Sequence, residues 1–172
     1  MGRTSFARWP CSIARAMDLV GDPWTPLILR EAFYGYRRFD DFQRELGIAR
    51  NTLTDRLRLL VDAGVMTRET YRTDPPRQEY VLTEMGRDLF GVLAALSRWG
   101  DRWLAGDDGP PTGFRHVRCG HTTHAEVVCS ECGESLRDAE TTWHMGPGYP
   151  ERLAARPDVR ERFRVAGEPR TG

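Results

Sequence analysis

The sequence predicts a mainly α-helical fold with one small β-hairpin, followed by a small module rich in cysteine and histidine. Three observations support this prediction. Apolar residues recur at three- and four-residue spacing through most of the first hundred residues, which is typical of amphipathic helices. This spacing changes to alternation between residues 65 and 82, which is typical of paired strands. Three of the four cysteines fall between residues 119 and 132.

Helices are expected first over residues 12–20, 22–33, 39–46 and 49–63. Glycines at 21, 47 and 64 favour helix ends at these points, and Asp22-Pro23 is typical of a helix start. The hairpin is expected from Val65–Tyr71 and Gln78–Leu82, and Thr83 then caps a last long helix. This order is that of a winged helix-turn-helix, in which the hairpin is the wing.

The amino-acid composition limits which classes of protein this chain can belong to. The 172 residues include 25 basic and 25 acidic side chains, so net charge neither indicates nor excludes nucleic-acid binding. Every basic side chain is arginine, which binds phosphate or guanine with two parallel hydrogen bonds. No apolar run approaches the ~20 residues of a membrane span, and the N-terminus lacks a secretory apolar region. We therefore expect a cytoplasmic protein with no membrane partner.

Two stretches rich in glycine and proline, at residues 106–113 and 146–150, divide the chain. We expect a DNA-binding and dimerisation domain over residues 1–105 and a Cys/His module over 106–145. The tail, 146–172, has few large apolar residues and is expected to be a short helix or disordered.

The helix at 49–63 has the two faces that a recognition helix needs. Leu53, Leu57 and Leu60 form its apolar face. Its polar face supplies the predicted base-contacting residues Arg50, Asn51, Thr52, Thr54, Asp55 and Arg58. The residues expected to contact phosphate are Arg37, Arg38, Arg68, Arg72 and Arg77. The alternative is a solvated charged face with no ligand.

Residues 10–104 closely resemble the HxlR-type winged-helix transcriptional regulators. The resemblance rests on a cysteine before the first helix and on the segments GDPWTPLILRE, RRFDDFQ, GIARNTLTDRLRLL and PPRQEYVLTEMG. It implies a homodimer that binds double-stranded DNA at a pseudo-palindromic operator. Ala49 and Asn51 depart from the family's usual pattern, so the operator sequence does not follow from the resemblance.

The last long helix has a stripe that is wider and more aromatic than one domain needs. A predicted dimer interface therefore comprises Leu89, Val92, Leu96, Trp99 and Trp103. The alternative is that the stripe packs entirely within one chain.

Cys11 lies immediately before the first helix, where backbone N–H groups and nearby arginines favour a thiolate. The resemblance implies that a cysteine at this position senses electrophiles or oxidants. The alternative is a small buried apolar residue.

The Cys/His module contains His-x2-Cys-Gly followed by Cys-x2-Cys-Gly. Two such turns predict a zinc-ribbon-like structural zinc site with the ligands His116, Cys119, Cys129 and Cys132. His121 or His124 could replace His116. The alternatives are free thiols or a redox disulfide.

We therefore expect a repressor of transcription. We do not expect an enzyme, because a nucleophile elbow, a phosphate loop and an HExxH motif are all missing from the sequence. A catalytic zinc assisted by Glu126 is a weaker alternative. The second alternative is a winged-helix protein-interaction module that docks through the zinc knuckle and does not read DNA.

Overall fold

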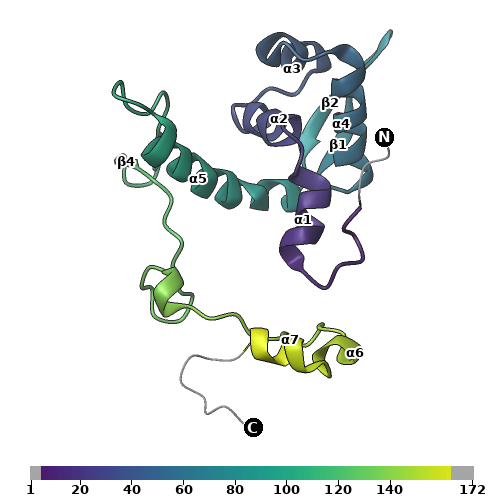
Figure 1. The fold of residues 1–172 in the computed structure, drawn as a ribbon. Coiled ribbons are helices and arrows are strands. Elements are labelled where there is room, and N and C mark those ends of the chain that lie inside the picture. The colour runs from purple at the N-terminus through teal and green to yellow at the C-terminus, as the bar shows by residue number, and fades with distance from the viewer. Residues whose placement is uncertain (1–4, 164–172) are drawn as a thin grey trace.

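The computed structural model describes residues 5–163 of the chain. Its first part runs α1 (Ser12–Val20), α2 (Trp24–Phe33), α3 (Phe39–Leu46), α4 (Arg50–Asp62), β1 (Met66–Thr73), β2 (Pro76–Leu82) and α5 (Glu84–Leu104). Helices α1 to α4 and the hairpin form one body, from which α5 projects (Figure 1). The expected winged helix-turn-helix is therefore present.

The turn between α3 and α4 is set by Gly47. Its φ of 60° lies in the left-handed region that glycine adopts without strain, and its N–H donates to Gln43 O. Helix α4 then begins at Arg50. Ala49 occupies the preceding cap position and has no side-chain acceptor to offer there.

The core lies where α2, α3, α4 and β1 meet. Phe42 of α3 and Leu53, Leu57 and Leu60 of α4 are fully buried there. The same cluster includes Ile28, Leu29, Ile48, Val65 and Met66. The leucine spacing of the sequence thus gives α4 one face fixed on the body, which leaves its other face outward.

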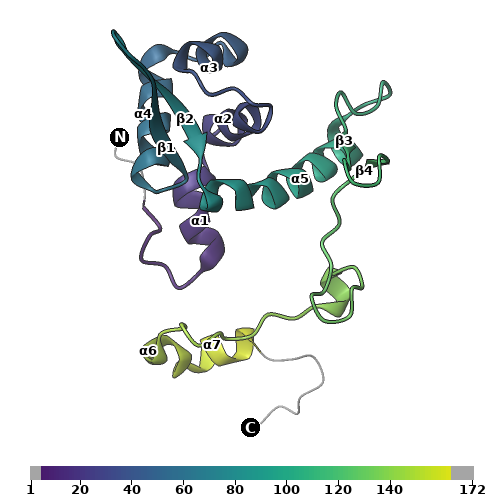
Figure 2. The same cartoon turned by 180° about the vertical axis from the view of Figure 1, so that it is seen from behind.

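The hairpin is longer than the sequence predicted. β1 and β2 pair in antiparallel register from Met66↔Leu82 to Thr73↔Pro76, so only Asp74 and Pro75 form the tip. The base of the hairpin is tied to the helical body because Tyr80 N–H donates to Arg37 O at 2.8 Å. Seen from behind, the hairpin extends beyond α3 and α4 (Figure 2).

The start of α5 is fixed by its predicted cap. Thr83 Oγ1 accepts from Gly86 N at 3.2 Å and lies 2.6 Å from Gly64 O, to which it donates. A Cβ on Gly86 would lie 2.2 Å from Val65 O, so a side chain there would clash with backbone. These contacts fix the direction in which α5 leaves the body.

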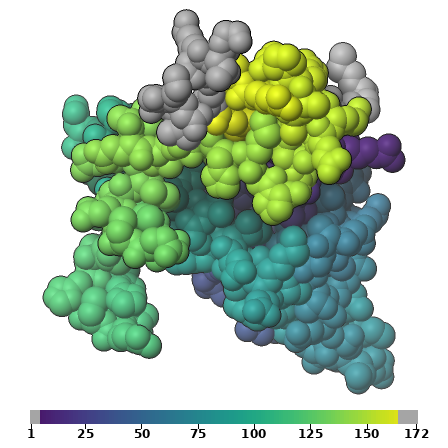
Figure 3. Space-filling model, turned by 90° about the horizontal axis from the view of Figure 1, so that it is seen from below, coloured from purple at the N-terminus to yellow at the C-terminus, as the bar shows by residue number. Residues whose placement is uncertain are grey.

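Beyond α5 the chain has short elements: β3 (Phe114–Arg115), β4 (Thr122–Thr123), the 3-10 turn η1 (Asp138–Glu140), α6 (Glu151–Ala154) and α7 (Pro157–Arg162). No residue from 106 to 145 is buried. Part of this segment, green at the lower left, protrudes from the rest of the molecule in the space-filling view (Figure 3). Of the predicted tail, residues 164–172 lie outside the described part of the chain.

One aromatic chain connects this extension to the body. Phe114 of β3 packs edge-to-face on Phe90 of α5, which packs in the same way on Phe33 of α2.

Among residues 5–163, no helix is long and apolar enough to cross a membrane.

Asp22 links the start of α2 to α4. Its Oδ1 accepts from Trp24 N at 3.0 Å and Thr25 N at 3.1 Å, and lies 3.0 Å from Arg56 Nε. The side chains of Asp22 and Arg56 are only 13% and 27% exposed.

Replacing Asp22 with alanine is expected to lower the free energy of unfolding by about 2 kcal/mol, because a cap and an ion pair are lost together. Urea denaturation followed by circular dichroism measures this. Asp22→Asn is the matched control, since it keeps an oxygen acceptor but not the charge, and should cost less. An Asp22→Ala variant as stable as the wild type would contradict the expectation.

Candidate nucleic-acid interface

Helix α4 presents a polar face to solvent. Arg50, Asn51, Thr54, Asp55 and Arg58 are exposed, and Thr52 is half-buried. The burial of the leucine face and the 3.6-residue period together place these side chains outward. The structure thus gathers the six predicted base-contacting residues on and beside one helix face.

Local contacts distinguish these side chains. The Arg50 guanidinium lies over the Phe39 ring, with Cζ 4.8 Å from its centroid. Thr54 Oγ1 donates to Arg50 O at 2.9 Å, so its hydrogen atom is used within the helix. Arg58 Nη1 lies 3.8 Å from Asp55 Oδ1. Both side chains are well exposed, and an ion pair of this kind adds little stability. Arg58 is therefore available to a ligand at small cost.

The loop before α3 and the hairpin share aromatic–arginine contacts. Arg38 Cζ lies 4.7 Å from the centroid of Tyr71, and Arg68 Cζ lies 5.9 Å from that of Tyr80. Arg37 Nη1 is 3.4 Å from Glu79 Oε1. These contacts hold the arginine planes against the hairpin.

The hairpin tip has a feature that the sequence analysis missed. Arg72 and Arg77 are directly opposite each other in the strand register, and both are exposed. Like charges in this position disfavour strand pairing. Arg72 Nε donates to Asp74 O at 2.8 Å, and no ion pair involves either arginine within residues 5–163. Such a pair suits an anion that lies across the tip.

The predicted dimer stripe on α5 is largely bare in the single chain. Val92, Leu96, Trp99 and Trp103 are each 55–62% exposed. Leu89 instead packs against the core cluster. The alternative of a stripe buried entirely within one chain is therefore wrong for four of the five residues.

Cys11 occupies the cap position of α1 with an extended backbone, φ −148° and ψ 117°. Its thiol is exposed. In the single chain Cys11 is therefore not buried as a small apolar residue.

The first Cys/His turn is formed locally. His116 Nδ1 lies 3.2 Å from Cys119 Sγ, and Gly120 N donates to His116 O at 2.7 Å. Gly120 has φ 75°, a value at which glycine is favoured. His124, one of the alternate ligands, instead lies 3.1 Å from Glu126 Oε1 through its Nε2. His121 is exposed.

The second turn has the same construction. Gly133 N donates to Cys129 O at 2.9 Å, and Gly133 has φ 77°. The pKa of the Cys129 thiol is lowered, first by the backbone N–H of Cys132, then by that of Glu131, and then by the Cys132 side chain. This turn therefore favours a thiolate.

The four predicted zinc ligands nevertheless form two separate pairs. Within residues 5–163, no three of the His, Cys, Asp or Glu side chains gather closely enough to hold a metal ion. Each turn closes on its own backbone hydrogen bonds, but the segment has no buried residue that would dock one turn on the other. The predicted zinc-ribbon module is thus not assembled in this structure.

A comparison with protein families identifies the winged-helix part. Residues 19–108 match the model of the HxlR-like helix-turn-helix family, which spans α2 to α5. The chain belongs to the HxlR-like helix-turn-helix family. The relatives named below carry the names of regulators or of a transcription factor.

Individual relatives match different shares of the chain. The chain is 48% identical to the HTH-type transcriptional regulator Rv3095 of Mycobacterium tuberculosis over 144 residues, 84% of this chain and 91% of the relative. It is 42% identical to the HTH-type transcriptional regulator sll1512 of Synechocystis over 95 residues, 55% of this chain and 70% of the relative.

Solved structures of similar proteins have the same fold. PA1607, named as a transcription factor, superposes with a TM-score of 0.75 at 35% identity and covers 83% of this chain and all of its own. The redox regulator HypR in its reduced form has a TM-score of 0.50 at 32% identity and covers 54% of this chain and 92% of its own. The winged helix-turn-helix fold of this HxlR-like chain is therefore shared with solved relatives.

Proposed function

We propose that the protein is a homodimeric, sequence-specific DNA-binding regulator that represses transcription at a pseudo-palindromic operator. The observation that carries the proposal is the outward polar face of α4 beside a hairpin tip where Arg72 faces Arg77. A helix with one anchored apolar face and one polar face fits the major groove, and a basic tip fits the adjacent phosphates.

Each predicted residue has a role in this arrangement. Arg50, Asn51 and Thr54, near the N-terminal end of α4, read base edges, since that end of a recognition helix enters the groove. Thr52, Asp55 and Arg58 flank them. The phosphate-binding residues are Arg37, Arg38, Arg68, Arg72 and Arg77.

The experiment is a salt titration of binding to DNA from the region upstream of the protein's own gene, measured by fluorescence anisotropy. We expect one short palindrome to bind tightly, with affinity falling steeply as salt rises. Binding no tighter than to random duplex would contradict sequence-specific recognition. It would favour a protein-interaction module.

Homodimerisation is supported by the bare face of α5. Val92, Leu96, Trp99 and Trp103 lie at helical spacing on one side, and exposed apolar stripes of this kind are typical of subunit interfaces. A two-fold axis across α5 would place the two copies of α4 about 34 Å apart, one turn of DNA.

We propose that Cys11 senses electrophiles. The exposed thiol at the start of α1 supports this, as does the similarity to HypR, which is named a redox regulator. Addition of the Cys11 thiol to N-ethylmaleimide forms a C–S bond, and the thiol proton goes to the ring. We expect it to weaken operator binding about tenfold or more by moving α1. Anisotropy titrations before and after treatment measure this effect.

The Cys11→Ser variant is the control, because the other three cysteines still react in it. Equal loss of affinity in that variant would assign the effect to those cysteines and would contradict a sensing role for Cys11.

We propose that His116, Cys119, Cys129 and Cys132 bind one structural zinc ion. Two preformed turns, each with two ligands and a left-handed glycine, support the proposal, as does the lowered pKa of Cys129. Zinc content by mass spectrometry should be about one equivalent per chain. It should fall in Cys132→Ser and stay unchanged in Cys11→Ser.

Single His→Asn variants at 116, 121 and 124 would identify the fourth ligand, since only one should lose zinc. A chain that retains no zinc after dialysis from a zinc-containing buffer would contradict the proposal.

A further inference from the structure

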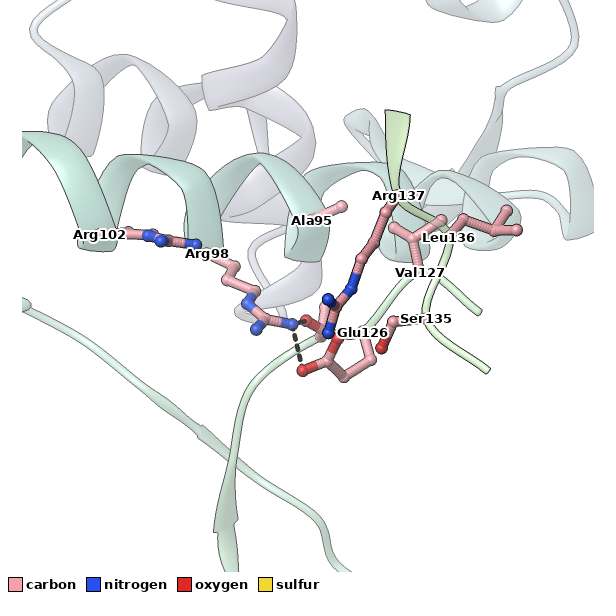
Figure 4. Close-up of a pocket in the computed structure, with 9 residues that line it drawn as sticks. Ala95, Arg98, Arg102, Glu126, Val127, Ser135, Leu136 and Arg137 are labelled. Atoms are coloured by element: carbon pink, nitrogen blue, oxygen red, sulfur yellow. Dashed lines mark hydrogen bonds and ion pairs between the residues drawn. The ribbon is translucent and has the colours of Figure 1, made fainter. Parts of the chain in front are cut away.

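A cavity of 610 Å³ lies between the second half of α5 and the extension, outside the proposed DNA interface. Arg98 and Arg102 of α5 line one side, and Glu126 and Arg137 line the other (Figure 4). The volume is within the usual range of small-molecule pockets, about 300–1,000 Å³. The cavity is thus large enough for an organic ligand.

The charges in this cavity do not balance. Three arginines and one glutamate of the described chain line it, and the guanidinium of Arg102 lies over the Trp103 ring with Cζ 4.8 Å from its centroid. Arg98 Nη1 lies 2.5 Å from Glu126 Oε1 and donates to Ala125 O at 2.7 Å. In the described part of the chain, no carboxylate comes within 4.0 Å of the guanidinium of Arg102 or Arg137.

The guanidinium groups of Arg98 and Arg137 extend toward Glu126 from opposite walls (Figure 4). Glu126 is shared further, because His124 Nε2 also lies 3.1 Å from its Oε1. Among the described residues, Glu126 is therefore the one carboxylate that lines the cavity, and it already pairs with Arg98, while Arg102 and Arg137 also line the cavity.

The remaining wall is apolar. Ala95 of α5 and Val127 and Leu136 of the extension line the cavity beside the charged groups. Val127 and Leu136 are held together because Leu136 N donates to Val127 O at 2.9 Å. The site thus offers apolar surface next to two guanidinium groups that have no carboxylate partner in the described chain, and guanidinium groups bind planar carboxylates with two hydrogen bonds.

We propose that this cavity binds a small organic carboxylate with an apolar body. The carboxylate pairs with Arg102 and Arg137, and the apolar part contacts Val127 and Leu136. Because the two walls come from α5 and from the extension, such a ligand fixes the extension against α5. This site does not depend on the proposed DNA binding, and its test uses no DNA.

The experiment is isothermal titration calorimetry of the full-length protein with 2-naphthoate. The neutral amide, 2-naphthamide, has almost the same shape and is the matched probe. We expect saturable 1:1 binding of the carboxylate and at least tenfold weaker binding of the amide. Inorganic phosphate is titrated separately and should bind more weakly, since it lacks an apolar body.

Variants locate the site. Arg102→Gln and Arg137→Gln should each weaken 2-naphthoate at least tenfold, whereas Arg118→Gln, an exposed arginine of the same segment that does not line the cavity, should not. Circular dichroism checks that each variant is folded. Glu126→Gln should instead strengthen binding severalfold, because it frees Arg98 for the ligand. A variant that merely damaged the structure would not strengthen binding.

Four results would overturn the proposal. One is the absence of 2-naphthoate binding below 10 mM in both the wild type and Glu126→Gln. Another is equal binding of the amide, which would indicate apolar partitioning. The third is unchanged affinity in both Arg102→Gln and Arg137→Gln. Tighter binding of phosphate than of 2-naphthoate would likewise contradict the assigned ligand class.

Discussion

Replacing Arg50 and Arg58 together with alanine is expected to weaken operator binding by about 100-fold or more, since each specific arginine–base contact is worth about 1–3 kcal/mol. Both side chains lie on the outward face of α4, and neither is needed by the core. The Arg50 side chain is exposed above the half-buried Phe39 ring, and the weak Arg58–Asp55 pair is exposed, so stability should change little. Fluorescence anisotropy at fixed salt measures the loss.

Arg152→Ala is the matched control, because Arg152 is an exposed arginine on α6, far along the chain from the interface. It should bind the operator like the wild type. Random-sequence DNA separates base reading from phosphate contact: the double variant should lose most of its preference for the operator. An equal loss on both DNAs would mean that these arginines contact phosphate only.

Replacing Leu96 with aspartate should convert the proposed dimer to monomer, with a dimer dissociation constant raised about 1,000-fold or more, because burial of an unpaired carboxylate costs several kcal/mol. Leu96 is 55% exposed in the single chain and lies at the centre of the α5 stripe, so the monomer should still fold. Sedimentation velocity across protein concentrations measures the association directly.

Val117→Asp is the control. Val117 is an apolar residue that is 93% exposed, and it lies outside α5 and its stripe. This variant should stay dimeric. If Leu96→Asp also stayed dimeric, the α5 stripe would not be the interface. A monomer should retain weak binding to a half-site and lose the benefit of two linked sites.

Local features of the fold could be predicted from sequence because they depend on neighbours along the chain. The leucine spacing of α4 set its buried face, Gly47 set the turn before it, and Thr83 set the start of α5. Each depends on contacts within about four residues, where backbone geometry leaves few choices. The helix bounds were therefore predicted to within a few residues.

Features of the site that join distant segments could not be predicted in the same way. The pairing of Arg72 with Arg77 depends on a two-residue tip, shorter than expected, and a different register would separate them. The contact between Asp22 and Arg56 joins residues on two different helices. No periodic pattern in the sequence marks either pair.

The sequence by itself determined the order of helices and strands, the polar and apolar faces of α4, and the two Cys/His turns. Each of these follows from local spacing and local hydrogen bonds. Only the tertiary structure decided that the α5 stripe is bare and that the Cys/His turns remain apart. It also decided that Arg98, Arg102 and Arg137 share a cavity with one carboxylate. The physical reason is that these features depend on how separate elements pack, which residue spacing does not specify.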